Sequence, residues 1–169
     1  IRQAITTHLD GLSMYPTTLG APELRNSIAA WLGRRFKGVE INPETEVIPV
    51  NGSREALFSF AQAMIDSSVR DPVVVCPNPF YQIYEGAALL AGASPHFINT
   101  FPDNQFKLDY AQLPDSVWAR VQLMYVCSPN NPTGSVMTLS DWQELFALSD
   151  RHGFIVASDE CYSEIYSDE

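Results

Sequence analysis

Residues 121–134 read VQLMYVCSPNNPTG, and this stretch decides the fold class. Its first half, 121–127, is a largely apolar run that is typical of a strand covered on both faces, as strands are in a parallel sheet. Its second half, 128–134, holds two prolines, two asparagines and a glycine, which are turn-forming residues. Asn131 precedes Pro132 and is therefore pushed toward an extended conformation that can present its amide to a ligand.

Strand and helix signals alternate along the rest of the chain. Helices are predicted from Pro22-Glu23 onward and at 54–65, 81–91 and 140–152, the last with Ser140 as its N-cap. Strands are predicted at 46–50, 72–76, 95–98, 121–127 and 154–157. This alternation predicts an α/β fold with a mainly parallel sheet. Ligands of such sheets bind beyond the carboxyl ends of the strands, where the predicted layout places segments 51–55, 128–134 and 158–162.

Composition excludes several classes of function. The 169 residues carry a formal charge of −10, with ten Lys plus Arg against twenty Asp plus Glu. Nucleic acids and anionic membrane surfaces both require clustered basic residues, so neither is an expected partner. The apolar runs are all far shorter than the roughly 20 residues of a membrane helix. Cys76, Cys127 and Cys161 form no CxxC pair and have no matching histidine cluster, which favours free thiols in a reducing cytoplasm over disulfides or a metal site.

Segment 51–56, Asn-Gly-Ser-Arg-Glu-Ala, joins a predicted strand to a predicted helix. The N-terminus of a helix offers unpaired N–H groups and a partial positive charge, so it can bind a phosphate. Gly52 lets the backbone turn tightly and approach an anion, and Ser53 adds a hydroxyl donor. A single glycine is a weak signal for phosphate binding. The alternative is therefore an ordinary helix start with Ser53 as its N-cap.

Segment 158–162, Ser-Asp-Glu-Cys-Tyr, follows another apolar strand. A carboxylate at the end of a buried strand must be solvated, paired or hydrogen-bonded, because burying it alone is costly. A pyridinium nitrogen is a suitable partner for Asp159, which would hold that nitrogen protonated. Tyr162, three residues later, can present its phenol to the same ligand. The alternative is that Asp159 only caps a helix.

Together these segments resemble the class I/II aminotransferases of fold type I, which depend on pyridoxal 5′-phosphate. The resemblance covers about residues 15–169 and rests on the order and spacing of the segments at 15–25, 52–57, 79–81, 128–134 and 159–162. It implies a three-layer α/β/α large domain with a mainly parallel sheet. Residues 1–19 would lead into this domain, residues 20–169 would form part of it, and the small C-terminal domain of the family would be absent.

The resemblance also implies roles for individual residues around the cofactor. The backbone at Ser53 and Arg54 would cradle the phosphate, and Tyr81 would stack on the pyridine ring. Asn131 and Tyr162 would hydrogen-bond the phenolic oxygen of the ring.

Three further implications concern the ring nitrogen, the subunit partner and the covalent link. Asp159 would pair with the ring nitrogen. Tyr15 would reach the phosphate of the neighbouring subunit, which implies a homodimer with shared active sites; for Tyr15 and Tyr81 the alternative is aromatic core. The family's Schiff-base lysine follows the aspartate motif, whereas Lys37 and Lys107 both precede Asp159, so neither matches and the chain by itself is expected to be inactive.

Segments 78–87 and 159–166 look like the succinyldiaminopimelate aminotransferases of bacterial lysine biosynthesis. Those enzymes exchange an amino group between N-succinyl-LL-2,6-diaminopimelate, an amino-acid substrate, and 2-oxoglutarate, a 2-oxo acid. Two alternatives stay open. The first is another fold-type I enzyme, such as an aspartate or aromatic aminotransferase or a carbon–sulfur lyase. The second is a non-catalytic binding or structural module, which a test of pyridoxal phosphate binding would distinguish.

Overall fold

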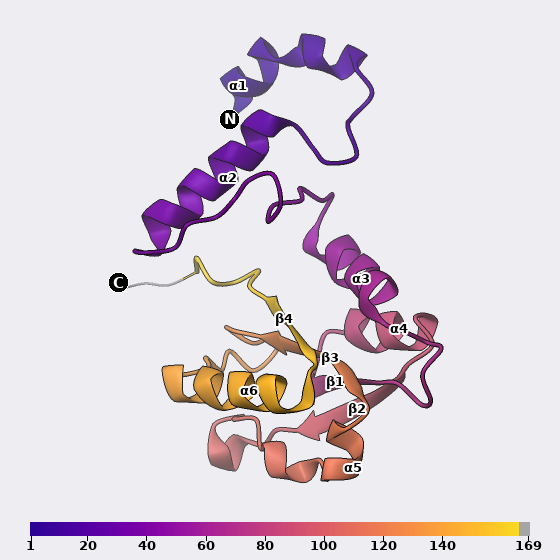
Figure 1. The fold of residues 1–169 in the computed structure, drawn as a ribbon. Helices are drawn as coiled ribbons and strands as arrows, with labels where there is room; N and C mark the ends of the chain where they lie inside the picture. The colour runs from indigo at the N-terminus through magenta and orange to yellow at the C-terminus, as the bar shows by residue number, and fades with distance from the viewer. Residues whose placement is uncertain (166–169) are drawn as a thin grey trace. The chain divides into compact units, whose positions relative to one another are not determined.

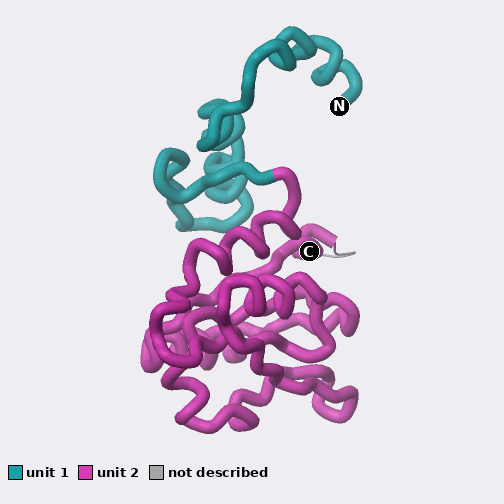
Figure 2. The backbone as a smooth tube through the Cα atoms, turned by 90° about the vertical axis from the view of Figure 1, so that its right-hand side faces the viewer, with its two compact units in different colours: residues 1–50 teal, residues 51–169 magenta. Residues whose placement is uncertain are grey.

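The structure is a computed structural model that describes residues 1–165. Tyr166, the last residue of segment 159–166, therefore lies outside the described residues. The chain forms two compact units that divide between Val50 and Asn51 (Figure 2). The predicted boundary between segment 1–19 and the large domain stays a prediction.

The first unit is helical. It contains α1 (Arg2–Thr7), a short 3-10 helix (Leu9–Ser13) and α2 (Pro22–Arg35). The strand predicted at 46–50 is wrong, because among residues 1–50 there is no second strand to pair with it. The buried Arg25 on α2 instead donates from Nε to the carbonyl oxygen of Val47 at 3.2 Å.

The second unit is built on a four-stranded parallel sheet, which confirms the predicted α/β class (Figure 1). The strand order is β2-β1-β3-β4, with bounds β1 (Val73–Asn78), β2 (Ser94–Asn99), β3 (Val121–Cys127) and β4 (Ile155–Asp159). Helix α3 (Ser53–Met64) precedes β1, and the strand connections contain α4 (Ile83–Leu90), α5 (Asp115–Trp118) and α6 (Leu139–His152). Within the described residues, no helix is long and apolar enough to cross a membrane.

Helices cover both faces of this sheet. Along β1, Val73 and Val75 point into the core that α5 and α6 share, whereas Val74 and Cys76 point into the core formed with α3 and α4. Both faces of the strand are buried over residues 73–77, which explains why this part of its sequence is continuously apolar instead of alternating. Parallel pairing of β3 with β4 brings the carboxyl ends of both strands to the same edge of the sheet.

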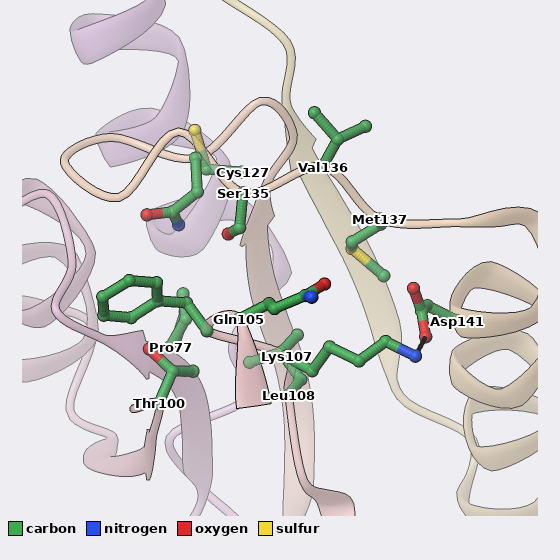
Figure 3. Close-up of a pocket in the computed structure, with 12 residues that line it drawn as sticks. Pro77, Thr100, Gln105, Lys107, Leu108, Cys127, Ser135, Val136, Met137 and Asp141 are labelled. Carbon is green, nitrogen blue, oxygen red and sulfur yellow. Dashed lines mark ion pairs between the residues drawn. The ribbon is translucent and has the colours of Figure 1, made fainter. Parts of the chain in front are cut away.

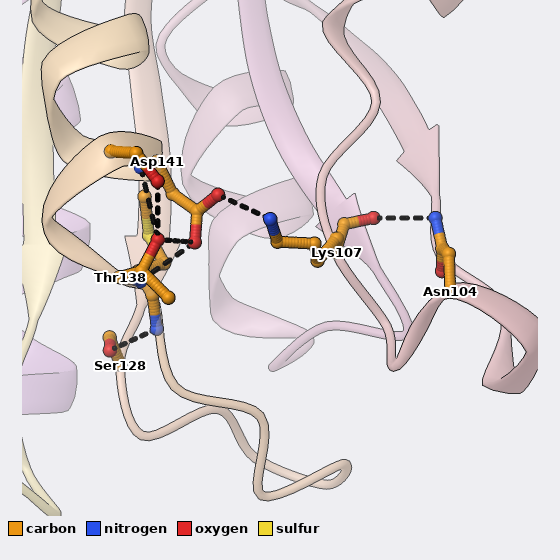
Figure 4. Close-up of polar contacts among 7 residues, drawn as sticks. Asn104, Lys107, Ser128, Thr138 and Asp141 are labelled. Carbon is orange, nitrogen blue, oxygen red and sulfur yellow. Dashed lines mark hydrogen bonds and ion pairs between the residues drawn. The ribbon is translucent and has the colours of Figure 1, made fainter.

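Helix α6 begins at Leu139, one residue before the predicted start, and Ser140 is not its N-cap. Thr138 caps the helix, because its side chain accepts the Asp141 N–H while the Asp141 carboxylate accepts the Thr138 N–H at 2.7 Å (Figure 4). Lys107 reaches the same carboxylate, with Nζ 3.0 Å from Oδ1. The Met137 N–H donates to Ser128 Oγ at 3.1 Å, so the helix start is tied to the loop that follows β3.

We expect Leu145→Ala to destabilise the full-length protein by about 2–5 kcal/mol, because Leu145 is fully buried between α6 and the sheet and truncation leaves a cavity. The matched control is Leu139→Ala on the same helix, where the side chain is 74% exposed and the change should be within about 0.5 kcal/mol. Thermal or urea unfolding measures both. Equal effects of the two substitutions would contradict the assigned packing of α6.

Candidate cofactor site

A cavity of about 200 Å³ lies where β3 and β4 end and α3 begins. Five residues predicted for the cofactor line it, namely Ser53, Tyr81, Asn131, Asp159 and Tyr162. The other lining residues are Tyr84, Cys127 and Cys161. Segments from four places in the sequence therefore meet at the carboxyl edge of the sheet, the position where α/β sheets bind ligands.

The N-terminus of α3 forms one end of the cavity. Helix α3 begins at Ser53 and its N-cap is Gly52, whose φ of +137° is open to glycine alone. The alternative that Ser53 serves as N-cap is therefore wrong. No side chain caps this helix, so its first N–H groups are available to an anion, and the Ser53 hydroxyl lies beside them.

Asp159 forms a second, oppositely charged part of the wall. It is the last residue of β4 and its side chain is buried. The Tyr84 hydroxyl donates to Oδ2 at 2.8 Å and the Cys161 N–H donates to Oδ1 at 3.3 Å. Among residues 1–165 no lysine, arginine or histidine forms an ion pair with it. A buried carboxylate with hydrogen bonds but no cation suits a ligand that carries a charged N–H group.

Tyr84 is the residue that sequence analysis missed. It lies on α4, its ring stacks on Tyr125 with centroids 4.6 Å apart, and it is buried. Burial raises the pKa of the Tyr84 hydroxyl, and the hydrogen bond to the Asp159 carboxylate raises it further, so the hydroxyl keeps its proton and donates it. Tyr81 lies just before α4, and the Tyr84 N–H donates to the Tyr81 carbonyl at 3.0 Å, so the spacing of three residues is a signal that could have singled Tyr84 out. Its contact with Asp159 has no sequence signal.

The loop after β3 presents Asn131. The Gly134 N–H donates to the Asn130 carbonyl at 2.7 Å, and the Asn130 N–H donates to the Ser135 carbonyl at 2.8 Å, which closes the loop on itself. The Asn131 side chain is exposed and donates from Nδ2 to the Tyr162 hydroxyl at 3.3 Å. The two residues predicted to share one ligand oxygen are therefore in contact with each other.

Two of the predicted site residues lie outside the set that lines the cavity. Arg54, directly after Ser53, contacts the hydroxyl of Tyr81 with its side chain. Tyr15 belongs to the first unit and is exposed, and its role toward a neighbouring subunit stays a prediction.

Lys107 lies at a different cavity. That cavity measures about 40 Å³ and is lined by Lys107 together with Thr100, Gln105, Leu108 and Met137, among others (Figure 3). The ammonium group is paired with Asp141. Lys107 is not among the residues that line the cavity at Asp159, and the expectation that it is not the Schiff-base lysine stays a prediction.

Two of the three thiols, those of Cys76 and Cys161, should differ in reactivity. Burial raises the pKa of the Cys76 thiol to about 12, so it stays protonated at pH 8 and should resist iodoacetamide. Cys161 is exposed and lines the candidate cavity, where its Sγ donates to Ser53 Oγ at 2.9 Å. We expect alkylation at Cys161 first, and slower alkylation when pyridoxal phosphate is present. Peptide mass spectrometry measures both, and faster labelling of Cys76 would contradict the assigned burial.

Known proteins resemble this chain in sequence and in fold. The family described as aminotransferase class I and II matches residues 2–169. An LL-diaminopimelate aminotransferase of Aquifex aeolicus is 35% identical over 90% of this chain and 38% of its own length. A crystal structure of an aminotransferase from Neisseria meningitidis is 52% identical, with a TM-score of 0.93 over 99% of this chain and 42% of that one.

An aromatic aminotransferase from Pyrococcus horikoshii is 32% identical, with a TM-score of 0.88 over 99% of this chain and 44% of that one. The chain thus spans about two fifths of the length of the relatives it matches. The family match covers nearly every residue, and the structural matches extend over both compact units. The chain belongs to the class I and II aminotransferase family.

Proposed function

We propose that the cavity at the ends of β3 and β4 binds pyridoxal 5′-phosphate, and that the full-length protein is an aminotransferase. The observation that carries the proposal is the buried Asp159 carboxylate, which lines the same cavity as the uncapped N-terminus of α3 and lacks a cationic partner among residues 1–165. Family membership supports the cofactor, because these enzymes use it.

In this proposal the phosphate lies at the start of α3. The first N–H groups of the helix and the hydroxyl of Ser53 donate to it, and the helix dipole favours its negative charge. Tyr81 is half-buried at the cavity wall and is oriented by an edge-on contact with Tyr84, with centroids 6.1 Å apart. Its free face would stack on the pyridine ring.

At the other end, Asp159 accepts the ring N–H and keeps that nitrogen protonated, while Tyr84 holds the carboxylate in place. When bound, the cofactor supplies an electron sink for the charge left behind when the substrate's α-proton departs. Asn131 and Tyr162 donate to the phenolic oxygen of the ring. Tyr15 would contact the phosphate held by a partner subunit, so the proposed assembly is a homodimer.

For the substrate, we propose amino transfer between N-succinyl-LL-2,6-diaminopimelate and 2-oxoglutarate. The residues of segments 78–87 and 159–166 support this choice. The relatives named LL-diaminopimelate aminotransferase support a donor with the diaminopimelate skeleton, and their name carries no succinyl group. Structural neighbours named aspartate aminotransferase and aromatic aminotransferase support a second candidate. In it the amino group comes from aspartate or from an aromatic amino acid, which are smaller donors.

A donor panel tests the proposal. The full-length protein would be purified, loaded with pyridoxal phosphate and given 2-oxoglutarate with N-succinyl-LL-diaminopimelate, LL-diaminopimelate, aspartate or phenylalanine, and glutamate formation would be followed. The highest kcat/KM is expected for the succinylated donor. A preference for aspartate or phenylalanine would move the protein to the second candidate, and no glutamate from any donor would contradict the aminotransferase proposal.

Asp159→Asn in the full-length enzyme should lower kcat by roughly 100-fold or more, which corresponds to about 2.7 kcal/mol of transition-state stabilisation. The amide is isosteric but carries no charge, so it cannot hold the ring nitrogen protonated. The control is Asp103→Asn, at an exposed carboxylate outside the cavity. Steady-state kinetics measure both, and an unchanged kcat in the Asp159 variant would show that the ring-nitrogen role is wrong.

A further inference from the structure

The side chain of Arg54 makes a contact that phosphate binding by its backbone does not explain. Nε donates to the Tyr81 hydroxyl at 2.6 Å, across 27 positions of sequence. The guanidinium carbon lies 5.8 Å from the centroid of the same ring, within the range of a cation–π interaction. A charged donor makes this a stronger hydrogen bond than one between neutral groups.

This contact completes the restraint of the Tyr81 ring. Tyr84 contacts the ring at an interplanar angle of 88°, and it is itself fixed by its stack on Tyr125 and its bond to Asp159. Tyr84 therefore limits the ring on one side, while Arg54 holds its hydroxyl end. A ring that is half-buried and restrained at both places loses little rotational freedom when a ligand stacks on it.

We propose that Arg54 is a positioning residue that sets the orientation of the Tyr81 ring for stacking on the pyridine ring of the cofactor. The inference rests on the proposed function, since it concerns the same cavity. It differs from a direct role of the guanidinium on the phosphate. Arg54 directly follows Ser53, so its side chain starts close enough to contact either the phosphate or the Tyr81 ring. The observed hydrogen bond and the ring contact both go to Tyr81.

The two roles predict different ligand dependence. Pyridoxamine 5′-phosphate and pyridoxamine share the pyridine ring and differ in the phosphate, and neither forms a Schiff base with a lysine. In the full-length protein, Arg54→Met should weaken binding of both ligands by the same factor, about threefold to tenfold. Tyr81→Phe keeps the ring but removes the hydroxyl, so it should have a similar effect.

The double variant Arg54→Met/Tyr81→Phe should bind no more weakly than either single variant, because both remove one interaction. Arg54→Lys keeps the charge but lacks the planar Nε donor and should resemble Arg54→Met. Equilibrium dialysis measures the dissociation constants, and thermal unfolding confirms that each variant is folded.

Three outcomes would overturn the inference. A loss confined to pyridoxamine 5′-phosphate would make Arg54 a phosphate ligand. Additive losses in the double variant would mean that the two residues act independently, and unchanged affinities would mean that the contact has no role in binding. Failure of the unaltered protein to bind pyridoxamine 5′-phosphate would instead contradict the proposed function, so the two failures are distinguishable.

Discussion

The buried carboxylate of Asp159 is the constraint on which the rest of the site depends. A charge at the end of an interior strand is costly unless donors surround it, and here the donors are the Tyr84 hydroxyl and the Cys161 N–H. Tyr84 can reach it only because α4 packs on the face of the sheet to which Tyr125 points, and the two rings stack there. The core on this face and the candidate site thus share Tyr84. The packing of the Tyr84 ring therefore also fixes the hydroxyl that donates to the Asp159 carboxylate.

The register of the sheet explains why the two polar loops meet. Cys127 on β3 pairs with Asp159 on β4, so both strands end at the same level. Asn131 follows Cys127 by four residues and Tyr162 follows Asp159 by three, and their side chains meet at 3.3 Å. Parallel pairing makes this convergence possible, because antiparallel neighbours would send these loops to opposite edges. The loop bonds between Asn130, Gly134 and Ser135 then hold Asn131 in position.

Local sequence could predict the buried strands, but it could not predict contacts between residues far apart in the chain. Strand 121–127 was predicted residue for residue, since a run that is buried on both faces is largely apolar and only Gln122 interrupts it. The run at 46–50 is rich in β-branched residues, yet it forms no strand, because Pro49 has no N–H to donate and because pairing depends on a neighbour that local sequence does not reveal. Ser140 and Thr138 are both plausible caps, and the Asp141 carboxylate decides between them. The Tyr84–Asp159 bond spans 75 positions and carries no periodic signal, so only the fold brings it into view.

The polarity of the cavity connects the local chemistry with the composition of the chain. A formal charge of −10 gives the protein no general attraction for a phosphate, so any anion must be held by local donors. Those donors lie at the start of α3, whereas the buried negative charge lies at Asp159, and the Cys161 thiol, hydrogen-bonded to Ser53, joins the two segments. A ligand that is anionic at one end and cationic at the other is favoured in a single orientation, because reversing it would place its anion beside Asp159. In the proposed site, the cavity would thereby select for the charge pattern of a ligand as well as for its shape.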